Sequence, residues 1–253
     1  MPEPRVFIEP DAIRGAAIHL AGDAFEHVAV VLRRGVGDRF IAVDAHCGTE
    51  HTAQITEVGR GALQATVLQT AEAREQPTIH LCLYQGLPKG KRFPLIIQKC
   101  TELGVARIVP VLTERAVARV EPDEAGGKLT RWTKIAQEAA RQSLRPIPPV
   151  VDAPLDLRAA LADWRTAGGV GLLLDEALAG SDDGGLRAGL AGIPPEGRVS
   201  VFIGPEGGFS TEEAETARDA GLLAVGLGSR ILRTETAAIA VCAIVMYEAG
   251  QLG

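Results

Sequence analysis

A strand that runs directly into a glycine-rich loop is the first feature of the sequence able to do chemistry. The segment VSVFIGPEGGFSTEE places Gly204, Gly207 and Gly208 between an apolar run and a helix start. Glycine permits positive φ angles and a close approach of the backbone to a ligand, so the amide groups of this loop are candidate hydrogen-bond donors. Ser210 and Glu213 have capping-box spacing, which predicts that a helix begins after this loop.

A second segment, LAVGLGSRILRTETA, repeats the order of strand, glycine turn and helix start. It carries Arg230, Arg233 and Glu235 beside apolar residues, where charges are costly unless they face solvent or a ligand. Both loops leave the carboxyl ends of their predicted strands, where open α/β sheets usually bind ligands. The pair of segments favours a ligand site, although either glycine turn alone is equally compatible with a plain tight turn.

Two familiar nucleotide-binding motifs do not match these loops. A phosphate-binding P-loop requires GxxxxGK[ST], and neither loop has the Lys-Ser/Thr pair. A dinucleotide fingerprint requires GxGxxG, and the glycines at 226 and 228 are followed by Ser-Arg-Ile without the third glycine. A nucleotide-cofactor oxidoreductase is therefore disfavoured.

The second part of the chain predicts a sheet that positions both loops. After Pro77, long apolar runs alternate with helical segments, the pattern of buried parallel strands covered by helices. Strands are expected at 79–85, 106–112, 170–176, 199–204 and 222–228, and helices at 93–103, 131–144, 211–220 and 234–249. The fold class predicted for this region is α/β.

The N-terminal part of the chain has a different pattern. Short alternating apolar runs separated by glycines fill residues 5–67, which predicts a small β-barrel. The polar stretch 70–77 ends in proline and is the best candidate for a linker. We therefore expect a first domain at 1–72 and a second at 73–253.

Charge and composition limit the possible partners. The net charge is −6, but residues 85–150 hold twelve basic and six acidic side chains, which is compatible with a local phosphate-binding surface or with a solvated helix face. The longest apolar run, 236–247, is shorter than the roughly 20 residues of a membrane span. The N-terminus lacks the pattern of a secretory signal, and the cysteines and histidines form no metal-binding spacing. We expect a cytoplasmic protein without a metal.

The motifs together resemble those of one family. IGPEGG with FSxxE, followed by LGxRILRTETA, closely resembles the RsmE-type ribosomal RNA methyltransferases of the SPOUT superfamily. IIQKCTELGV and QEAARQSLRPIPPV in the middle of the chain, and PRVF and HV near its start, are similar to further blocks of that family. Pro94, Arg141 and Leu144 depart from the residues usual in that family.

The resemblance implies a fold, a cofactor and a reaction. It implies a PUA-like barrel for RNA recognition at 1–72, then a SPOUT domain at 73–253 whose last segment forms a trefoil knot, and a homodimer. The final helix is expected to pack either at the dimer interface or only in the core. The implied reaction transfers a methyl group from S-adenosylmethionine, leaving S-adenosylhomocysteine, to N3 of a uracil in 16S ribosomal RNA within the 30S subunit.

The resemblance also implies the site residues. S-adenosylmethionine is expected between three loops, which comprise Leu174, Gly204, Pro205, Glu206, Gly207, Gly208, Leu227, Gly228, Ile231 and Leu232. Arg233 is expected to stabilise the charge that develops on the uracil oxygens, and Glu235 or water to take the proton. The residues expected to bind RNA are Arg5, Arg33, Lys89, Lys91, Arg92 and Arg145.

Two other functions remain open from the sequence. A SPOUT enzyme can act elsewhere, for example on a ribose 2′-hydroxyl or a tRNA guanine, and locating the methyl group distinguishes that case. A non-enzymatic RNA-binding assembly factor of the same fold would not bind S-adenosylmethionine.

Overall fold

The computed structural model describes residues 3–72, 77–116, 122–179, 185–190 and 196–252. The chain divides into two compact units. The first comprises Met1–Gln76 and Ala140–Pro148, and the second comprises Pro77–Ala139 and Pro149–Gly253. The segment 140–148, which lies within the second domain expected from the sequence, groups with the first unit.

The first unit is built on a six-stranded sheet in the order β1-β4-β5-β6-β3-β2. Its strands are β1 (Arg5–Ile8), β2 (Ile13–Arg14), β3 (Ala17–Ala21), β4 (Arg39–Asp44), β5 (Glu50–Val58) and β6 (Ala62–Ala71). Only β1 and β4 pair in parallel; the other pairs are antiparallel. Register shifts in the β5–β6 pair mark irregularities of the kind that bend a sheet.

A short helical segment covers this sheet. It consists of α1 (Gly22–Phe25) and the π-helical turn Glu26–Val31, and a 3₁₀ turn, Pro10–Ala12, follows β1. Val28 from the π-helical turn is buried in a core with Ile18, Phe40 and Ile55. Alternate residues of the strands point into this core, as the alternating apolar runs predict.

The second unit contains a parallel sheet in the order β10-β8-β7-β12-β11-β13, with β9 also paired to β8. Its strands are β7 (Ile79–Gly86), β8 (Arg107–Leu112), β9 (Val150–Val151), β10 (Leu155–Asp156), β11 (Val170–Leu174), β12 (Gly197–Ile203) and β13 (Leu223–Val225). Every pair is parallel. The predicted α/β class is confirmed.

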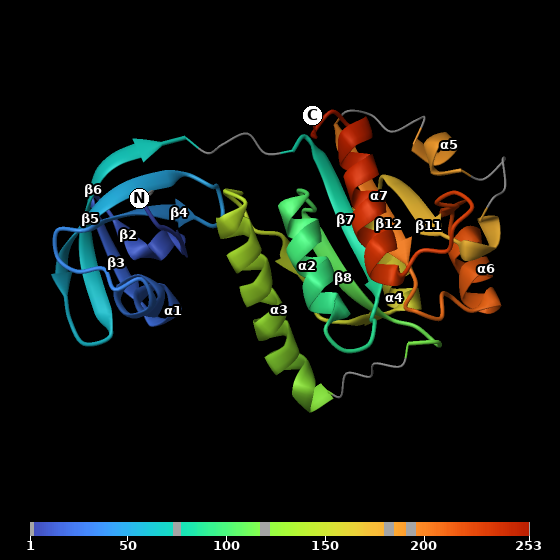
Figure 1. Ribbon diagram of the computed structural model, residues 1–253, viewed down its shortest axis with the longest axis horizontal. Coiled ribbons are helices and arrows are strands. Elements are labelled where there is room, and N and C mark those ends of the chain that lie inside the picture. The colour runs from blue at the N-terminus through green and yellow to red at the C-terminus, as the bar shows by residue number, and fades with distance from the viewer. Residues whose placement is uncertain (1–2, 73–76, 117–121, 180–184, 191–195, 253) are drawn as a thin grey trace. The chain divides into compact units, whose positions relative to one another are not determined.

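Helices cover both faces of this sheet (Figure 1). On one face lie α2 (Arg92–Glu102), α3 (Pro122–Gln142) and α7 (Thr234–Glu248), whose apolar side chains share one core with those of β7 and β12. On the other face lie α4 (Leu157–Ala167) and α6 (Thr211–Asp219), packed around the stacked rings of Tyr84 and Phe202. A short helix, α5 (Leu186–Leu190), precedes β12, and a 3₁₀ turn, Glu176–Leu178, follows β11.

Helical periodicity explains why α2 and α7 pack together. On α7 the buried residues recur at intervals of three and four, which places them in one stripe: Thr234, Ala237, Ala238, Val241, Cys242, Val245 and Met246. On α2 the buried residues Phe93, Ile96, Ile97 and Cys100 follow the same spacing. The small residues on α7 allow the close contact that the two helices make.

Helices α3 and α4 differ from the sequence prediction. α3 begins at Pro122, nine residues earlier than expected, because Gly126 and Gly127 do not interrupt it despite their low helix propensity. α4 was not expected, although Asp156 caps it by accepting a hydrogen bond from the Ala159 amide. Among the described residues, no helix is long and apolar enough to cross a membrane.

Candidate active site

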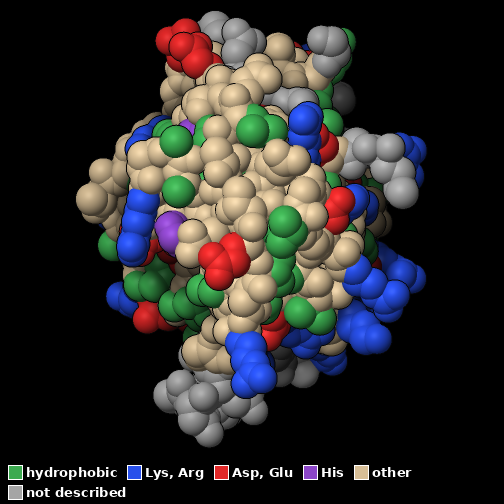
Figure 2. Space-filling model, turned by 90° about the vertical axis from the view of Figure 1, so that its left-hand side faces the viewer, with side chains coloured by type: hydrophobic (Ala, Val, Ile, Leu, Met, Phe, Trp, Pro, Cys, Tyr) green, Lys and Arg blue, Asp and Glu red, His purple; other side chains and the backbone are tan. Residues whose placement is uncertain are grey.

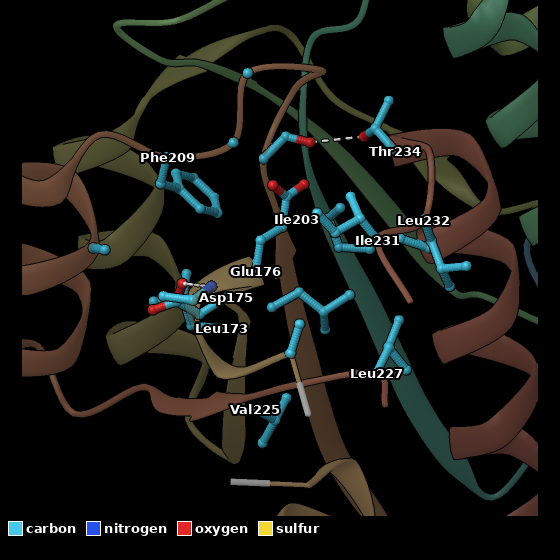
Figure 3. Close-up of a pocket in the computed structure, with 18 of the residues that line it drawn as sticks. Leu173, Asp175, Glu176, Ile203, Phe209, Val225, Leu227, Ile231, Leu232 and Thr234 are labelled. Atoms are coloured by element: carbon cyan, nitrogen blue, oxygen red, sulfur yellow. Dashed lines mark hydrogen bonds between the residues drawn. The ribbon is translucent and has the colours of Figure 1, made fainter. Parts of the chain in front are cut away.

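Three loops at the carboxyl edge of the parallel sheet enclose a cavity of about 310 Å³ (Figure 3). They follow β11, β12 and β13, so the two glycine-rich segments of the sequence meet there. Apolar side chains from the strand ends and loops form much of its wall: Leu173, Leu174, Ile203, Phe209, Val225, Leu227, Ile231 and Leu232. The volume and lining are those of a small-molecule pocket.

Glycine is required at two positions around this cavity. A Cβ atom on Gly204 would lie 2.8 Å from the Cα atom of Gly208 and 2.9 Å from the amide nitrogen of Phe209. A Cβ atom on Gly226 would lie 2.6 Å from the carbonyl oxygen of Leu178. Neighbouring backbone would have to move in both cases, so these glycines keep the loops close together.

A buried hydrogen-bond network joins the first glycine loop to α7. The Thr234 hydroxyl donates to the Gly204 carbonyl oxygen over 2.7 Å (Figure 3) and accepts from the Gln85 side-chain amide over 2.9 Å. The same Gln85 amide nitrogen also donates to the carbonyl oxygens of Gly86 and Gly204. Because Gln85 is the penultimate residue of the central strand β7, this network joins three segments that are distant in the sequence.

Charged side chains lie at the wall of the cavity. Arg218 pairs with Asp175 over 2.5 Å, and the Arg115 guanidinium donates to the Gly207 carbonyl oxygen. Glu176 extends into the cavity from the turn after β11 (Figure 3). Arg115, Asp175 and Glu176 were not predicted as site residues, although Asp175 and Glu176 are the last two residues of the strand expected at 170–176 and directly follow β11 in the structure.

An ion cluster lies beside the first glycine loop. The Arg92 Nη1 atom is 2.5 Å from the Glu206 Oε1 atom, which also accepts from the backbone amide of Lys89. Burial would raise the pKa of Glu206, but its own backbone amide, the Lys89 amide and the Arg92 guanidinium together lower that pKa below its usual value. Glu235 lies on the other side of Arg92, with an Nε–Oε1 distance of 3.5 Å.

The structure brings most of the predicted cofactor residues together. Leu174, Gly204, Pro205, Gly207, Gly208, Leu227, Gly228, Ile231 and Leu232 line the cavity. Glu206 belongs to the same loop but does not line the cavity, because its side chain turns towards Arg92. Of the two predicted catalytic residues, Arg233 is the exposed N-cap residue of α7, and Glu235 lies in the first turn of that helix.

The residues predicted to bind RNA fall in both units. In the second unit, Lys89 and Lys91 are exposed. In the first unit, Arg33 is exposed, whereas Arg5 is only 7 % exposed and pairs with Glu50 over 2.8 Å. Burial lowers the pKa of Arg145 to about 10. Figure 2 shows the basic side chains of one face in separate groups around its margin.

A metal centre would require cysteine, histidine or carboxylate side chains that lie close together. Cys47, Cys82, Cys100 and Cys242 are free thiols. Among the residues that the structure describes, no group of three or more His, Cys, Asp or Glu side chains is placed to hold a metal ion.

Comparisons with known proteins identify the class and the family. Residues 74–246 match the model of the RNA methyltransferase domain. Ribosomal RNA small subunit methyltransferase E of Bacillus subtilis is 32 % identical over 231 residues, which cover 90 % of this chain and 89 % of that protein. The chain belongs to this family of RNA methyltransferases, as the resemblance of its motifs predicts.

Solved structures agree over nearly the whole chain. The crystal structure of ribosomal RNA small subunit methyltransferase E from Neisseria gonorrhoeae, bound to S-adenosyl methionine, is 30 % identical with a TM-score of 0.83 and covers 97 % of this chain and 98 % of that one. A Legionella pneumophila protein in complex with bound SAM is 29 % identical, with a TM-score of 0.87 and 98 % coverage of both chains.

Proposed function

We propose that this protein transfers a methyl group from S-adenosylmethionine to N3 of a uracil in 16S ribosomal RNA within the 30S subunit. The observation that carries the proposal is the cavity that the loops after β11, β12 and β13 form in a chain of the small-subunit methyltransferase E family. Related structures in this family hold the same cofactor. Action on ribosomes implies a cytoplasmic protein.

The cavity fits S-adenosylmethionine in size and chemistry. Its volume of about 310 Å³ is compatible with a compact, folded form of the cofactor, and its leucine and isoleucine side chains can cover the adenine ring. Gly204 and Gly226 have no side chain, and a Cβ atom at either position would displace neighbouring backbone. The loop backbone is therefore free to approach the adenine edge closely. When bound, this cofactor supplies an electrophilic methyl group on a sulfonium.

The protein's own residues must supply charge and a proton acceptor. Uracil N3 carries a proton at neutral pH, and loss of that proton places negative charge on the O2 and O4 oxygens. In the proposed step the proton would go to Glu235 or water, and the electron pair of the N3–H bond would form the bond to the methyl carbon. The bond from that carbon to the sulfonium would break with its electron pair going to sulfur, which would leave S-adenosylhomocysteine. The guanidinium of Arg233, two residues before Glu235, belongs to an exposed residue and is suited to stabilise the developing charge.

The first unit is proposed to be a PUA-like barrel that recognises RNA. Its β5–β6 pair has register shifts of the kind that bend a sheet, and the exposed Arg33 lies in the segment before β4. Arg5 and Arg145 are more suited to holding this unit together, because they are largely buried. Lys89 and Lys91 in the second unit offer exposed charge for phosphate groups.

A trefoil knot and a homodimer are also part of the proposal. α7 follows β13 at one edge of the sheet, yet it packs on β7 and β12 in the middle, which is the return path that a knot would need. The outer face of α7 exposes Ile244 and Tyr247, the latter by 65 %. A helix that is apolar on both faces is suited to pack against a second copy of the chain.

One experiment tests this function against its alternatives. Unmethylated 30S particles are incubated with methyl-labelled S-adenosylmethionine, and the RNA is digested and analysed by nucleoside mass spectrometry. We expect label on N3-methyluridine. Label on a ribose or a guanine would identify a different methyltransferase, and absence of cofactor binding in calorimetry would favour a non-enzymatic assembly factor.

A further inference from the structure

One arginine stands between two carboxylates from different parts of the second unit. Arg92 begins α2, Glu206 lies in the loop after β12, and Glu235 lies in the first turn of α7. The guanidinium contacts Glu206 through Nη1 at 2.5 Å and approaches Glu235 through Nε at 3.5 Å. The backbone amide of Lys89 adds a hydrogen bond of 2.9 Å to the same Glu206 oxygen. Arg92 therefore links the glycine loop of the cavity to the helix that follows Arg233.

The environment of Glu235 distinguishes its two oxygens. The side chain is only 14 % exposed, and Oε1 faces Arg92. Oε2 is buried and accepts no hydrogen bond from any residue that the structure describes. A buried carboxylate oxygen without a donor is costly, so this oxygen has an open capacity to accept a hydrogen bond or a proton.

The charge of the cluster argues against RNA as the partner of Arg92. Two carboxylates and one guanidinium leave one net negative charge, so a backbone phosphate would meet repulsion there. The side chain is also already engaged by Glu206 and Glu235. Lys89 and Lys91, which precede Arg92 in the sequence, are exposed and better suited to bind phosphate.

We propose that Arg92 is a positioning residue that orients Glu235, so that its Oε2 atom can accept the uracil N3 proton, and that anchors the cofactor loop through Glu206. This inference rests on the proposed function, because it assigns a role within the same reaction. Arg92 touches neither substrate nor cofactor in this account. Its effect passes through the two carboxylates.

A double-mutant cycle tests the inference. Arg92→Met, Glu206→Ala and the double variant are compared for kcat on 30S particles at saturating cofactor. We expect Arg92→Met to lower kcat roughly 10- to 100-fold and the double variant to lose little more, because residues that act as a unit have non-additive effects. Arg92→Lys should recover most of the turnover, since an ammonium can still lie between the carboxylates.

RNA binding separates positioning from direct contact. For Arg92→Met we expect the RNA affinity and its salt dependence to equal those of the wild type. The inference would be overturned if the losses in kcat of the two single variants multiplied in the double variant, and if Arg92→Met also bound RNA more weakly. In that case the slope of log RNA affinity against log salt would fall by about one phosphate contact. Turnover of Arg92→Lys as low as that of Arg92→Met would overturn it as well.

Cofactor affinity gives a readout that does not depend on turnover. Calorimetry without RNA should show S-adenosylmethionine binding weakened roughly 3- to 10-fold in Arg92→Met and Glu206→Ala, again without additivity. Lys99→Met removes a cation that pairs with Glu102 on the exposed side of the same helix, and it should change neither kcat nor affinity. If Arg92→Met bound S-adenosylmethionine as tightly as the wild type, the anchoring of the glycine loop would be contradicted. This result does not depend on which RNA the wild-type protein methylates, so it can be told apart from a failure of the proposed function.

Discussion

The hydroxyl of Thr234 donates a hydrogen bond to the carbonyl oxygen of Gly204, across 30 residues of sequence. One residue opens the last helix, and the other opens the glycine loop of the cavity. The side-chain amide of Gln85, near the end of β7, donates a hydrogen bond to the same hydroxyl. The cavity therefore depends on a buried polar network as well as on its apolar wall.

Replacement of Thr234 by valine should destabilise the protein and weaken cofactor binding. The variant keeps the shape of the side chain but removes two buried hydrogen bonds, the one to the Gly204 carbonyl oxygen and the one from the Gln85 amide, which costs roughly 1–3 kcal/mol. Urea titration measures the free energy of unfolding. The control Thr166→Val removes an exposed hydroxyl on α4, and equal stability of the two variants would contradict the network's importance.

Gly204→Ala should abolish most S-adenosylmethionine binding. Its Cβ atom would lie 2.8 Å from the Gly208 backbone, so the loop must shift. We expect the dissociation constant to rise at least about tenfold, which corresponds to about 1.4 kcal/mol. Gly127→Ala on α3 is the matched control, because no atom lies within 4 Å of its new Cβ. Unchanged cofactor affinity in Gly204→Ala would place the cofactor elsewhere.

Arg233→Ala should reduce methyl transfer without loss of cofactor affinity. Removal of one group that stabilises developing charge typically lowers kcat about 100- to 1,000-fold. Single-turnover assays on 30S particles measure the rate, and calorimetry measures cofactor binding. Arg158→Ala, an exposed arginine on α4, serves as the control. Normal turnover of Arg233→Ala would end the role proposed for this guanidinium.

Charge reversal at Lys89 and Lys91 should weaken RNA binding and flatten its salt dependence. Each phosphate contact contributes roughly 0.7–0.9 to the slope of log affinity against log salt, so loss of both contacts should be visible in a salt titration. Arg158→Glu is a control for the change of net charge. An unchanged slope would show that these lysines make no phosphate contact.

Asp163 should stabilise the fold at neutral pH, and this stabilisation should be lost at acidic pH. Burial would raise its pKa, but the Arg107 and Tyr84 hydrogen bonds and the Arg107 charge together lower it. A depressed pKa in the folded state adds stability that is present above the unfolded pKa of about 3.9 and is lost as the pH falls through the folded pKa. The difference in unfolding free energy between wild type and Asp163→Asn should therefore be constant from neutral pH down to about pH 5, and should shrink below about pH 4.

The control for this pH dependence is Asp219→Asn, whose side chain is exposed at the end of α6. We expect this variant to unfold like the wild type across the same range. A difference between wild type and Asp163→Asn that stays constant to the lowest pH would contradict a carboxylate effect.

The sequence predicted the parts of the site that depend on local pattern. The strand-to-glycine transitions placed Gly204 and Leu227 at the sheet edge, and the spacing of Ser210 and Glu213 predicted the capping box that begins α6. Parallel strands meet at one edge, so two separate loops could be expected to form one site.

Long-range partners could not be predicted in the same way. The turn of Glu206 towards Arg92 depends on how the β7–α2 loop packs on the glycine loop after β12, and no local pattern encodes that contact. Gln85 stands at the end of an apolar run, where its sequence context gives no sign of a role in a buried network. The extent of α3 was missed because packing overrides the low helix propensity of Gly126 and Gly127.

The central claim is that this cavity holds the methyl donor for small-subunit ribosomal RNA. The most direct measurement is transfer of labelled methyl from S-adenosylmethionine to unmethylated 30S particles, by the wild-type protein and by Gly204→Ala in parallel, with the product nucleoside identified by mass spectrometry. The account predicts N3-methyluridine from the wild type and little or none from the variant. Equal labelling by both proteins, or no label in the RNA with the wild type, would contradict it.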